Sequence, residues 1–418
     1  MKKSIYHGWF IVLTCMVIMA FVFAPRINLV GVFVQPLSES FGVSRTAVTL
    51  MMTIGTIVTM LGALFVAGKL FQKVKIKKVM TVAIVLEIIA FIGYALAPNI
   101  YVIYFFAVIG GFNGVCLTSI PISILINSWF GPKLRGRAMG IAMLGSGLGS
   151  MILNPVMGFI IQEFSWRWGY ALIAVLNLIV TLPLILFTIA NSPAEKNLEQ
   201  IGQVENTGTS AVNGLSFKQA RHTSIFWIMA FAFILYSAVS TIFNANGAAY
   251  YTDIGFTPIF AASLISFSSA ALLVGKLILG EICDRTNAFT GAAIASMVMF
   301  FGVVLILVTS NIPSMGIPSA IVFGLGNALP TVTIPLLTAE MFGNLDYGQI
   351  VSKLNVASSF GAALGPILGS SFYDMTGSYS SAWYIVLFLM AGMTIITLIG
   401  KTMTKQLHNK MEGVERIE

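Results

Sequence analysis

Long apolar stretches alternate with short polar breaks along the whole of this sequence. A helix needs about 20 apolar residues to cross the hydrocarbon core of a bilayer, and stretches of that length recur throughout the chain. The breaks between them carry turn and cap residues, such as Pro98-Asn99 and Asn311-Ile312-Pro313. We therefore predict twelve membrane-spanning helices. Their expected bounds are 8–36, 46–67, 77–97, 101–128, 137–162, 167–190, 224–251, 258–281, 287–309, 313–339, 349–372 and 380–401.

The composition supports an all-α polytopic membrane protein and argues against a soluble one. Hydrophobic residues make up 57% of the 418 positions, charged residues only 9%, and the mean hydropathy is +0.91. An ordinary soluble domain carries about a quarter charged residues, so a chain this poor in charge needs lipid as part of its solvent. The first apolar stretch is far longer than the apolar region of a signal peptide, and we expect it to be a span.

The basic residues gather on one side of the predicted spans. If the N-terminus lies inside, only Arg45 and Arg167 fall outside, and 18 of the 23 basic residues fall in cytoplasmic segments. These 18 are Lys2, Lys3, Lys69, Lys73, Lys75, Lys77, Lys78, Lys133, Arg135, Arg137, Lys196, Lys218, Arg221, Arg285, Lys401, Lys405, Lys410 and Arg416. The positive-inside rule therefore predicts that both termini lie in the cytoplasm, and we expect the protein in the inner membrane. The net charge of +8 then reflects topology, and we expect no nucleic-acid partner.

A long polar stretch divides the chain into two halves of six spans. We expect a first bundle at 1–190, a cytoplasmic linker at 191–223 and a second bundle with a short tail at 224–418. A faint repeat supports this division, because Gly42-Val43-Ser44 and Gly255-Phe256-Thr257 open corresponding spans. Parallel repeats of six spans suit alternating access, in which two bundles rock about a central site.

Several short motifs follow one another in an order and at a spacing that are specific in combination. They are Tyr6-His7-Gly8-Trp9, Gly31-Val32-Phe33-Val34-Gln35-Pro36-Leu37, Phe41-Gly42-Val43-Ser44-Arg45, Trp129-Phe130, Arg135-Gly136-Arg137-Ala138-Met139-Gly140, Trp166-Arg167, the run from Gly361 through Gly369, and Tyr373-Asp374-Met375-Thr376-Gly377. Together they resemble the major facilitator superfamily, and within it the monocarboxylate and oxalate/formate antiporter branch. The resemblance implies a fold of two pseudo-symmetric six-helix bundles and gradient-driven or exchange transport.

The resemblance also implies a cytoplasmic gate. Arg135 and Arg137 resemble family residues that bond helix ends in the outward-open state, although as basic residues they also fit the positive-inside rule. Asp284-Arg285 resembles the gate pair of the second half. The family usually carries Asp where this chain has Gln72, which puts the matching salt bridge of the first half in doubt.

Ionisable side chains inside spans are costly and therefore mark candidate sites. Arg26 lies near the middle of the first span beside Pro25 and Asn28, a combination of kink, fixed positive charge and amide that suits a carboxylate. Alternatively, Arg26 reaches the interface or pairs structurally with an acid. Glu87 lies midway along the third span, either as the buried partner of a basic residue or as a proton-carrying carboxyl, and we favour structural pairing.

Two lysines also lie within predicted spans. Lys276 stands where the resembled branch usually has an arginine that contacts the substrate carboxylate, although it can also reach the nearby interface. Lys353 lies one residue from the family's lysine, which is about 100° around a helix, so we favour an interfacial position. Among the amides in the spans, Asn28, Asn327 and Asn355 are weak candidates for substrate binding, because such amides more often bond neighbouring helices.

Enzymatic and metal chemistry find no support in the sequence. The three cysteines, Cys15, Cys116 and Cys283, offer no disulfide framework or metal spacing, and no nucleophile–base cluster falls in the spans. The glycine-rich runs 145–149 and 361–365 lie inside apolar spans, where glycine permits close helix packing. We therefore expect no enzyme activity, no cofactor and no metal.

These observations lead to a functional prediction. We expect a secondary transporter of small organic anions of the monocarboxylate type, coupled to protons or exchanging, which works as a monomer in the lipid bilayer by rocker-switch alternating access. Arg26 and Lys276 would neutralise the substrate. The alternatives are an exporter of a neutral or drug-like solute and a non-transporting membrane sensor on the same scaffold.

Overall fold

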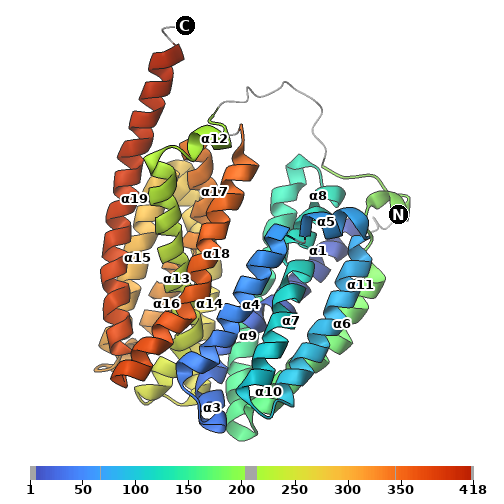
Figure 1. Ribbon diagram of the computed structural model, residues 1–418, viewed down its shortest axis with the longest axis vertical. Coiled ribbons are helices and arrows are strands. Elements are labelled where there is room, and N and C mark those ends of the chain that lie inside the picture. The colour runs from blue at the N-terminus through green and yellow to red at the C-terminus, as the bar shows by residue number, and fades with distance from the viewer. Residues whose placement is uncertain (1–5, 66, 203–213, 344, 416–418) are drawn as a thin grey trace. The chain divides into compact units, whose positions relative to one another are not determined.

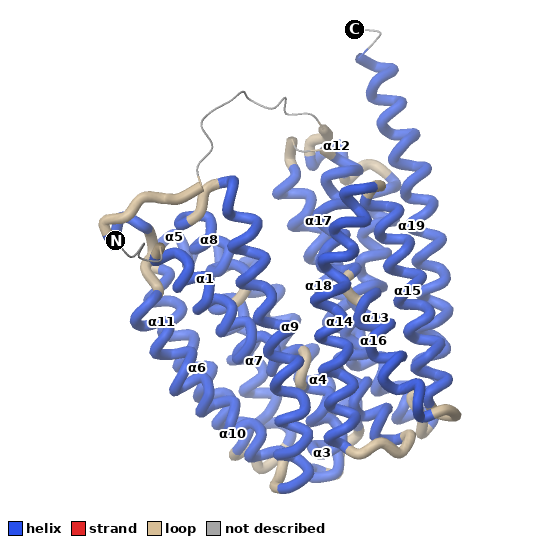
Figure 2. The backbone as a smooth tube through the Cα atoms, turned by 180° about the vertical axis from the view of Figure 1, so that it is seen from behind, coloured by secondary structure: helices blue, strands red, loops and turns tan. Residues whose placement is uncertain are grey.

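The computed structural model describes residues 6–65, 67–202, 214–343 and 345–415 (Figure 1). These residues form helices and loops, and no strand occurs among them (Figure 2). The helices of the first half are α1 His7–Ile18, α2 Ala24–Ile27, α3 Val30–Phe41, α4 Arg45–Phe65, α5 Ala67–Lys73, α6 Ile76–Ala95, α7 Ile100–Leu117, α8 Ser119–Trp129, α9 Pro132–Glu163, α10 Trp166–Leu176 and α11 Leu182–Thr188. Those of the second half are α12 Phe217–Ala220, α13 Ser224–Asp253, α14 Pro258–Arg285, α15 Ala288–Thr309, α16 Gly316–Gly326, α17 Leu329–Phe342, α18 Tyr347–Thr376 and α19 Ser380–Glu415.

Each of the twelve predicted spans coincides with helical structure. Within the described residues, 10 helical segments are long and apolar enough to cross a membrane. They are His7–Ile27, Arg45–Phe65, Ile100–Trp129, Lys133–Glu163, Trp166–Thr188, Ser224–Asp253, Pro258–Arg285, Ala288–Thr309, Pro313–Phe342 and Ser380–Gln406. The two remaining predicted spans, 77–97 and 349–372, coincide with α6 and α18, which are 20 and 30 residues long. The predicted all-α polytopic fold is confirmed.

Contacts between Cα atoms divide the chain into two compact units. Unit one comprises Met1–Gly208 and Asn244–Ser266, and unit two comprises Thr209–Phe243 and Phe267–Glu418. The division predicted from sequence, with a linker at 191–223, stays a prediction. The structure adds that the end of α13 and the start of α14 pack with the first half of the chain.

The first predicted span is interrupted near the middle, at Pro25. A five-residue π-helix, Met19–Phe23, ends two residues before this proline. Proline lacks the N–H that would bond the carbonyl four residues back, and here the Phe21 carbonyl accepts a 2.8 Å hydrogen bond from Asn177 Nδ2 instead. The interrupted segment therefore keeps its backbone satisfied, and the short α2 that follows carries Arg26.

The segment after the sixth predicted span fixes the start of α6. Asn191 Oδ1 accepts a hydrogen bond from the Lys77 amide, while the Asn191 side chain and amide both donate to Glu195. These hydrogen bonds, with a smaller contribution from Lys75 and Lys77, lower the pKa of the Glu195 carboxyl. The contact anchors the helix that carries Glu87.

Glycines of α9 let the first span approach closely. A Cβ atom built on Gly145 would collide with the backbone carbonyl of Met16, and one built on Gly149 would lie 2.5 Å from the carbonyl oxygen of Ala20. This is the close packing predicted for the glycine-rich run 145–149, and it holds α9 against the helix that leads to Arg26.

We predict that Gly145→Ala destabilises the protein while Gly140→Ala, in the same helix, does not. Overpacking against a backbone costs about 1–3 kcal/mol. A Cβ on Gly140 meets no atom within 4 Å. Thermal unfolding of the detergent-solubilised protein should show a lower midpoint for Gly145→Ala alone. Equal midpoints for the two variants would contradict the close approach of α9 to the first span.

Candidate functional site

Arg26 and Glu87 form a buried ion pair in unit one. Arg26 Nε lies 3.7 Å from Glu87 Oε1, and the two side chains are 13% and 1% exposed. The other carboxylate oxygen, Oε2, accepts a 2.9 Å hydrogen bond from Asn113 Nδ2 of α7. Two separately predicted candidates, the basic residue of the first span and the acid of the third, are thus brought together.

The guanidinium group of Arg26 lies in a slot between α4 and α7. Three glycines line this slot, which we call the glycine slot: Gly55, Gly110 and Gly114. A Cβ built on Gly114 would collide with Arg26 Nη1, and one on Gly55 would lie 3.8 Å from Nη2. One on Gly110 would lie 3.5 Å from Arg26 Nε and 3.8 Å from Glu87 Oε2. Larger side chains at these positions would crowd the ion pair.

Arg26 engages its acid through only one edge of the guanidinium. The ion pair runs through Nε, and among the described residues no side chain or carbonyl hydrogen-bonds to Nη1 or Nη2. These two nitrogens form the fork that binds carboxylates in a bidentate manner. The arrangement therefore leaves a carboxylate-binding edge of Arg26 without a protein partner in the described part of the chain.

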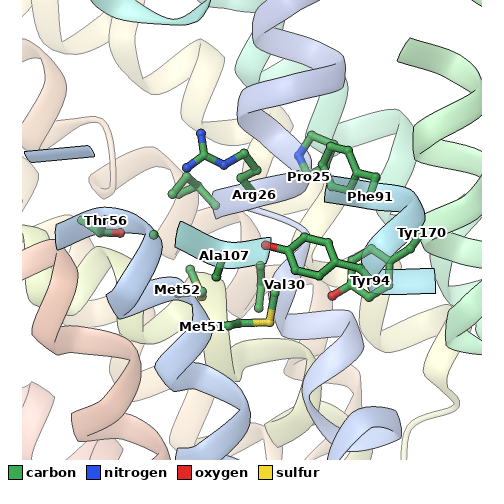
Figure 3. Close-up of a pocket in the computed structure, with 12 residues that line it drawn as sticks. Pro25, Arg26, Val30, Met51, Met52, Thr56, Phe91, Tyr94, Ala107 and Tyr170 are labelled. Atoms are coloured by element: carbon green, nitrogen blue, oxygen red, sulfur yellow. The ribbon is translucent and has the colours of Figure 1, made fainter. Parts of the chain in front are cut away.

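A small cavity lies beside Arg26 (Figure 3). Its volume is about 20 Å³, roughly the space of one water molecule. Phe91, Tyr94, Tyr170 and Met52 contribute to its wall. The Tyr170 hydroxyl is buried and has no hydrogen-bond partner among the described residues. An organic anion would need the surrounding helices to move apart before it could enter.

Of the other predicted binding residues, Asn28 belongs to the same unit as this pair, and the rest belong to unit two. Asn28 is in unit one, where its Nδ2 donates to the Ser146 carbonyl at 3.4 Å. Lys276, in α14 of unit two, is partly exposed and has no hydrogen-bond or ion-pair partner among the described residues. Asn327 is buried, with Oδ1 unpartnered within the described chain, whereas Asn355 is exposed. Lys353 is also exposed.

The predicted cytoplasmic gate residues are on the surface of their own units. Arg135 and Arg137 of α9 are exposed, as is Asp284 of α14. Arg285 pairs with Glu281 one turn earlier in the same helix, with Nε 2.6 Å from Oε1. The gate role of these residues stays a prediction.

A second ion pair was not anticipated from the sequence. Arg45, at the start of α4, makes a bidentate pair with Asp253, at the end of α13, with distances of 2.5 Å for Nη1–Oδ2 and 2.8 Å for Nη2–Oδ1. The side chains are 8% and 24% exposed. A signal was present in the repeat, because Arg45 follows Gly42-Val43-Ser44 and Asp253 precedes Gly255-Phe256-Thr257. The two charges therefore flank corresponding segments of the repeat, and the contact itself is shown by the structure.

Comparison with known proteins agrees with this architecture. The family model of the Major Facilitator Superfamily matches residues 15–343. An uncharacterised transporter of this type, YcxA of Bacillus subtilis (strain 168), is 22% identical over 98% of this chain and 100% of its own length. Monocarboxylate transporter 12 of Mus musculus is 26% identical over 68% of this chain and 63% of its own. Thus the match spans less than two thirds of that transporter.

Solved structures share the fold. A D-xylose–proton symporter superposes with a TM-score of 0.73 at 15% identity, covering 94% of this chain and 97% of its own. At that identity the likeness concerns the fold alone. The matching family and relatives are transporters, so the chain is a multi-pass transport protein and not an enzyme. It belongs to the major facilitator superfamily.

Proposed function

We propose that the protein is a secondary transporter of small organic anions of the monocarboxylate type, working by alternating access. The observation that carries this proposal is the free Nη edge of Arg26 in the glycine slot. A guanidinium fork in an apolar, largely water-excluded site matches a planar carboxylate in both shape and charge. The similarity to monocarboxylate transporter 12 supports the same substrate class.

The positive charge of Arg26 is energetically costly within the membrane unless a negative charge compensates it. A cation inside a span costs several kcal/mol or is compensated by a partner. Glu87 compensates Arg26 through a single edge, and a bound anion would compensate it through the fork. We infer that the bound substrate anion compensates the charge of Arg26 while the substrate crosses the membrane.

Lys276 is our proposed second cationic contact. It lies within a span, and none of the described side chains compensates its charge. An ionisable residue in this situation is a candidate for a substrate pathway. A lysine can attract a carboxylate as a point charge, without the bidentate geometry of arginine.

The Arg45–Asp253 pair is our proposed closure on the extracytoplasmic side. We propose that the protein lies in the inner membrane with both termini cytoplasmic, the orientation that the distribution of basic residues favours. In that orientation α4 begins, and α13 ends, at the outer surface. A largely buried bidentate pair joins these two helix ends, and alternating access would break it whenever the outer side opens.

We predict that Arg26→Gln lowers the uptake of labelled lactate, pyruvate, formate or oxalate into proteoliposomes at least about tenfold, since losing one partner of a buried charge pair costs 2 kcal/mol or more. Lys276→Gln should also lower it. Arg221→Gln, which removes an exposed arginine outside the spans, is the matched control and should leave uptake unchanged.

Two outcomes would contradict the proposal at different levels. Full uptake by both Arg26→Gln and Lys276→Gln would refute the binding roles. A wild-type protein that moves none of the four acids, with or without a pH gradient, would refute the substrate class.

We predict that Arg45→Gln and Asp253→Asn together open the outer side. Ala249 lines a cavity of about 240 Å³ with Gln35 and Thr252, so a cysteine placed at Ala249 reports on access to it. Its labelling by a membrane-impermeant maleimide should become at least severalfold faster in the double variant. Arg221→Gln is the control, because that exposed arginine lies outside the predicted spans. Unchanged labelling would argue against a closing role.

A further inference from the structure

The Glu87 carboxylate is bound at both oxygens by protein groups. Oε1 faces Arg26 Nε of α2, and Oε2 accepts from Asn113 Nδ2 of α7. The side chain is 1% exposed, so water contributes little to its solvation. An ionised carboxylate at this depth therefore depends on Arg26 for its charge compensation.

The two ion pairs of unit one differ in geometry. The Arg45–Asp253 pair uses two short contacts of 2.5 Å and 2.8 Å, as expected of a fork that meets a carboxylate. The Arg26–Glu87 pair uses one edge at 3.7 Å and leaves the fork unused. The Arg26–Glu87 pair is therefore looser than the Arg45–Asp253 pair, and Arg26 keeps its Nη edge for another carboxylate.

The surroundings of Glu87 contain few ionisable groups. Arg26 is the charged neighbour, and Tyr94 of its own helix and Tyr170 of α10 are the titratable hydroxyls beside the pair. The glycine-slot face of α4 contributes no charge, and α7 contributes Asn113, with Cys116 one turn beyond it. The segment 177–188, which also packs on α6, has no ionisable side chain. A change in the charge of Glu87 would therefore act chiefly on Arg26.

Asn113 is suited to both protonation states of Glu87. It now donates through Nδ2, and its Oδ1 is buried without a hydrogen-bond partner among the described residues. If Glu87 takes up a proton, its O–H becomes a donor, and rotation of the Asn113 amide would present Oδ1 as the acceptor. The same residue can thus stabilise the carboxylate and the carboxylic acid.

We propose that Glu87 is a built-in carboxylate that competes with the transported anion for Arg26, and that its protonation releases Arg26 to the anion. This inference rests on the proposed anion transport. A proton adds to Glu87 Oε2, and the resulting O–H donates a hydrogen bond to Asn113 Oδ1, while the ion pair with Arg26 is replaced by one between Arg26 and the anion. The empty pair has no net charge, and the protonated, anion-bound group has none either. Loading with only the proton or only the anion would leave one uncompensated charge.

The test compares wild type with Glu87→Gln, which mimics the protonated acid. Equilibrium exchange of labelled pyruvate or lactate is measured with the same pH on both sides, so that no proton gradient drives it. Wild-type exchange should fall by up to about tenfold per pH unit at high pH, as expected for one required proton. Glu87→Gln should vary less than about twofold over the same range. Glu163→Gln, an exposed acid at the end of α9, should behave as wild type.

The proton can also be counted on the wild-type protein alone, in case Glu87→Gln does not fold. Calorimetric titration with pyruvate in two buffers of different ionisation enthalpy should show uptake of about one proton per bound anion at high pH. Absence of proton uptake overturns the inference, as does a pH response retained in Glu87→Gln. In both cases carboxylate transport by wild type would leave the proposed function intact. If wild type neither binds nor moves a carboxylate, both fail.

Discussion

The buried ion pair between Arg26 and Glu87 is the constraint that organises unit one. A guanidinium group cannot be left in an apolar span without compensation, so helices around it must supply room and charge. Glycines at positions 55, 110 and 114 supply the room, and Glu87 supplies the charge. Asn113 of α7 holds the acid in place. Three helices beyond the one that carries Arg26 are therefore adapted to a single side chain.

The interruption of the first span lies directly before Arg26. Pro25 has no N–H to donate to the carbonyl of Phe21, and Asn177 Nδ2 donates to that carbonyl instead. Asn177 begins a second π-helical segment, Asn177–Thr181. That segment also ends two residues before a proline, Pro183. Irregular backbone at membrane depth is tolerated where the protein itself satisfies it. The short helix bearing Arg26 can thus depart from regular geometry within the first span.

The sequence was sufficient for the spans because a membrane imposes a length and an apolar composition that are visible residue by residue. It also identified Arg26 and Glu87 as exceptional, since few charges occur in spans. For Glu87 the sequence favoured pairing with a basic residue, but it did not identify Arg26 as the partner, because nothing local links a residue of the third span with one of the first. The glycines of the slot are scattered over two spans, and their shared role depends on tertiary packing that a sequence pattern does not reveal.

The Arg45–Asp253 pair shows the same limit at a span end. Arg45 alone resembles an ordinary interfacial arginine, and only the repeat suggests a counterpart on α13. The predicted gate residues were chosen by resemblance, and within each unit the structure shows them exposed. Contacts between residues far apart in the sequence were therefore the features that the sequence predicted least well.

The central claim is that the Nη edge of Arg26 holds the carboxylate of the substrate. It is tested most directly by ¹³C–¹⁵N dipolar recoupling on bilayer-reconstituted protein, with ¹⁵N-labelled arginine and pyruvate labelled at its carboxyl carbon. The account predicts a carbon–nitrogen distance of about 4 Å, because charge-assisted N–H···O bonds are about 2.7–2.9 Å long, and loss of the signal in Arg26→Lys. Absence of the contact in wild type, or its persistence in Arg26→Lys, would contradict the account.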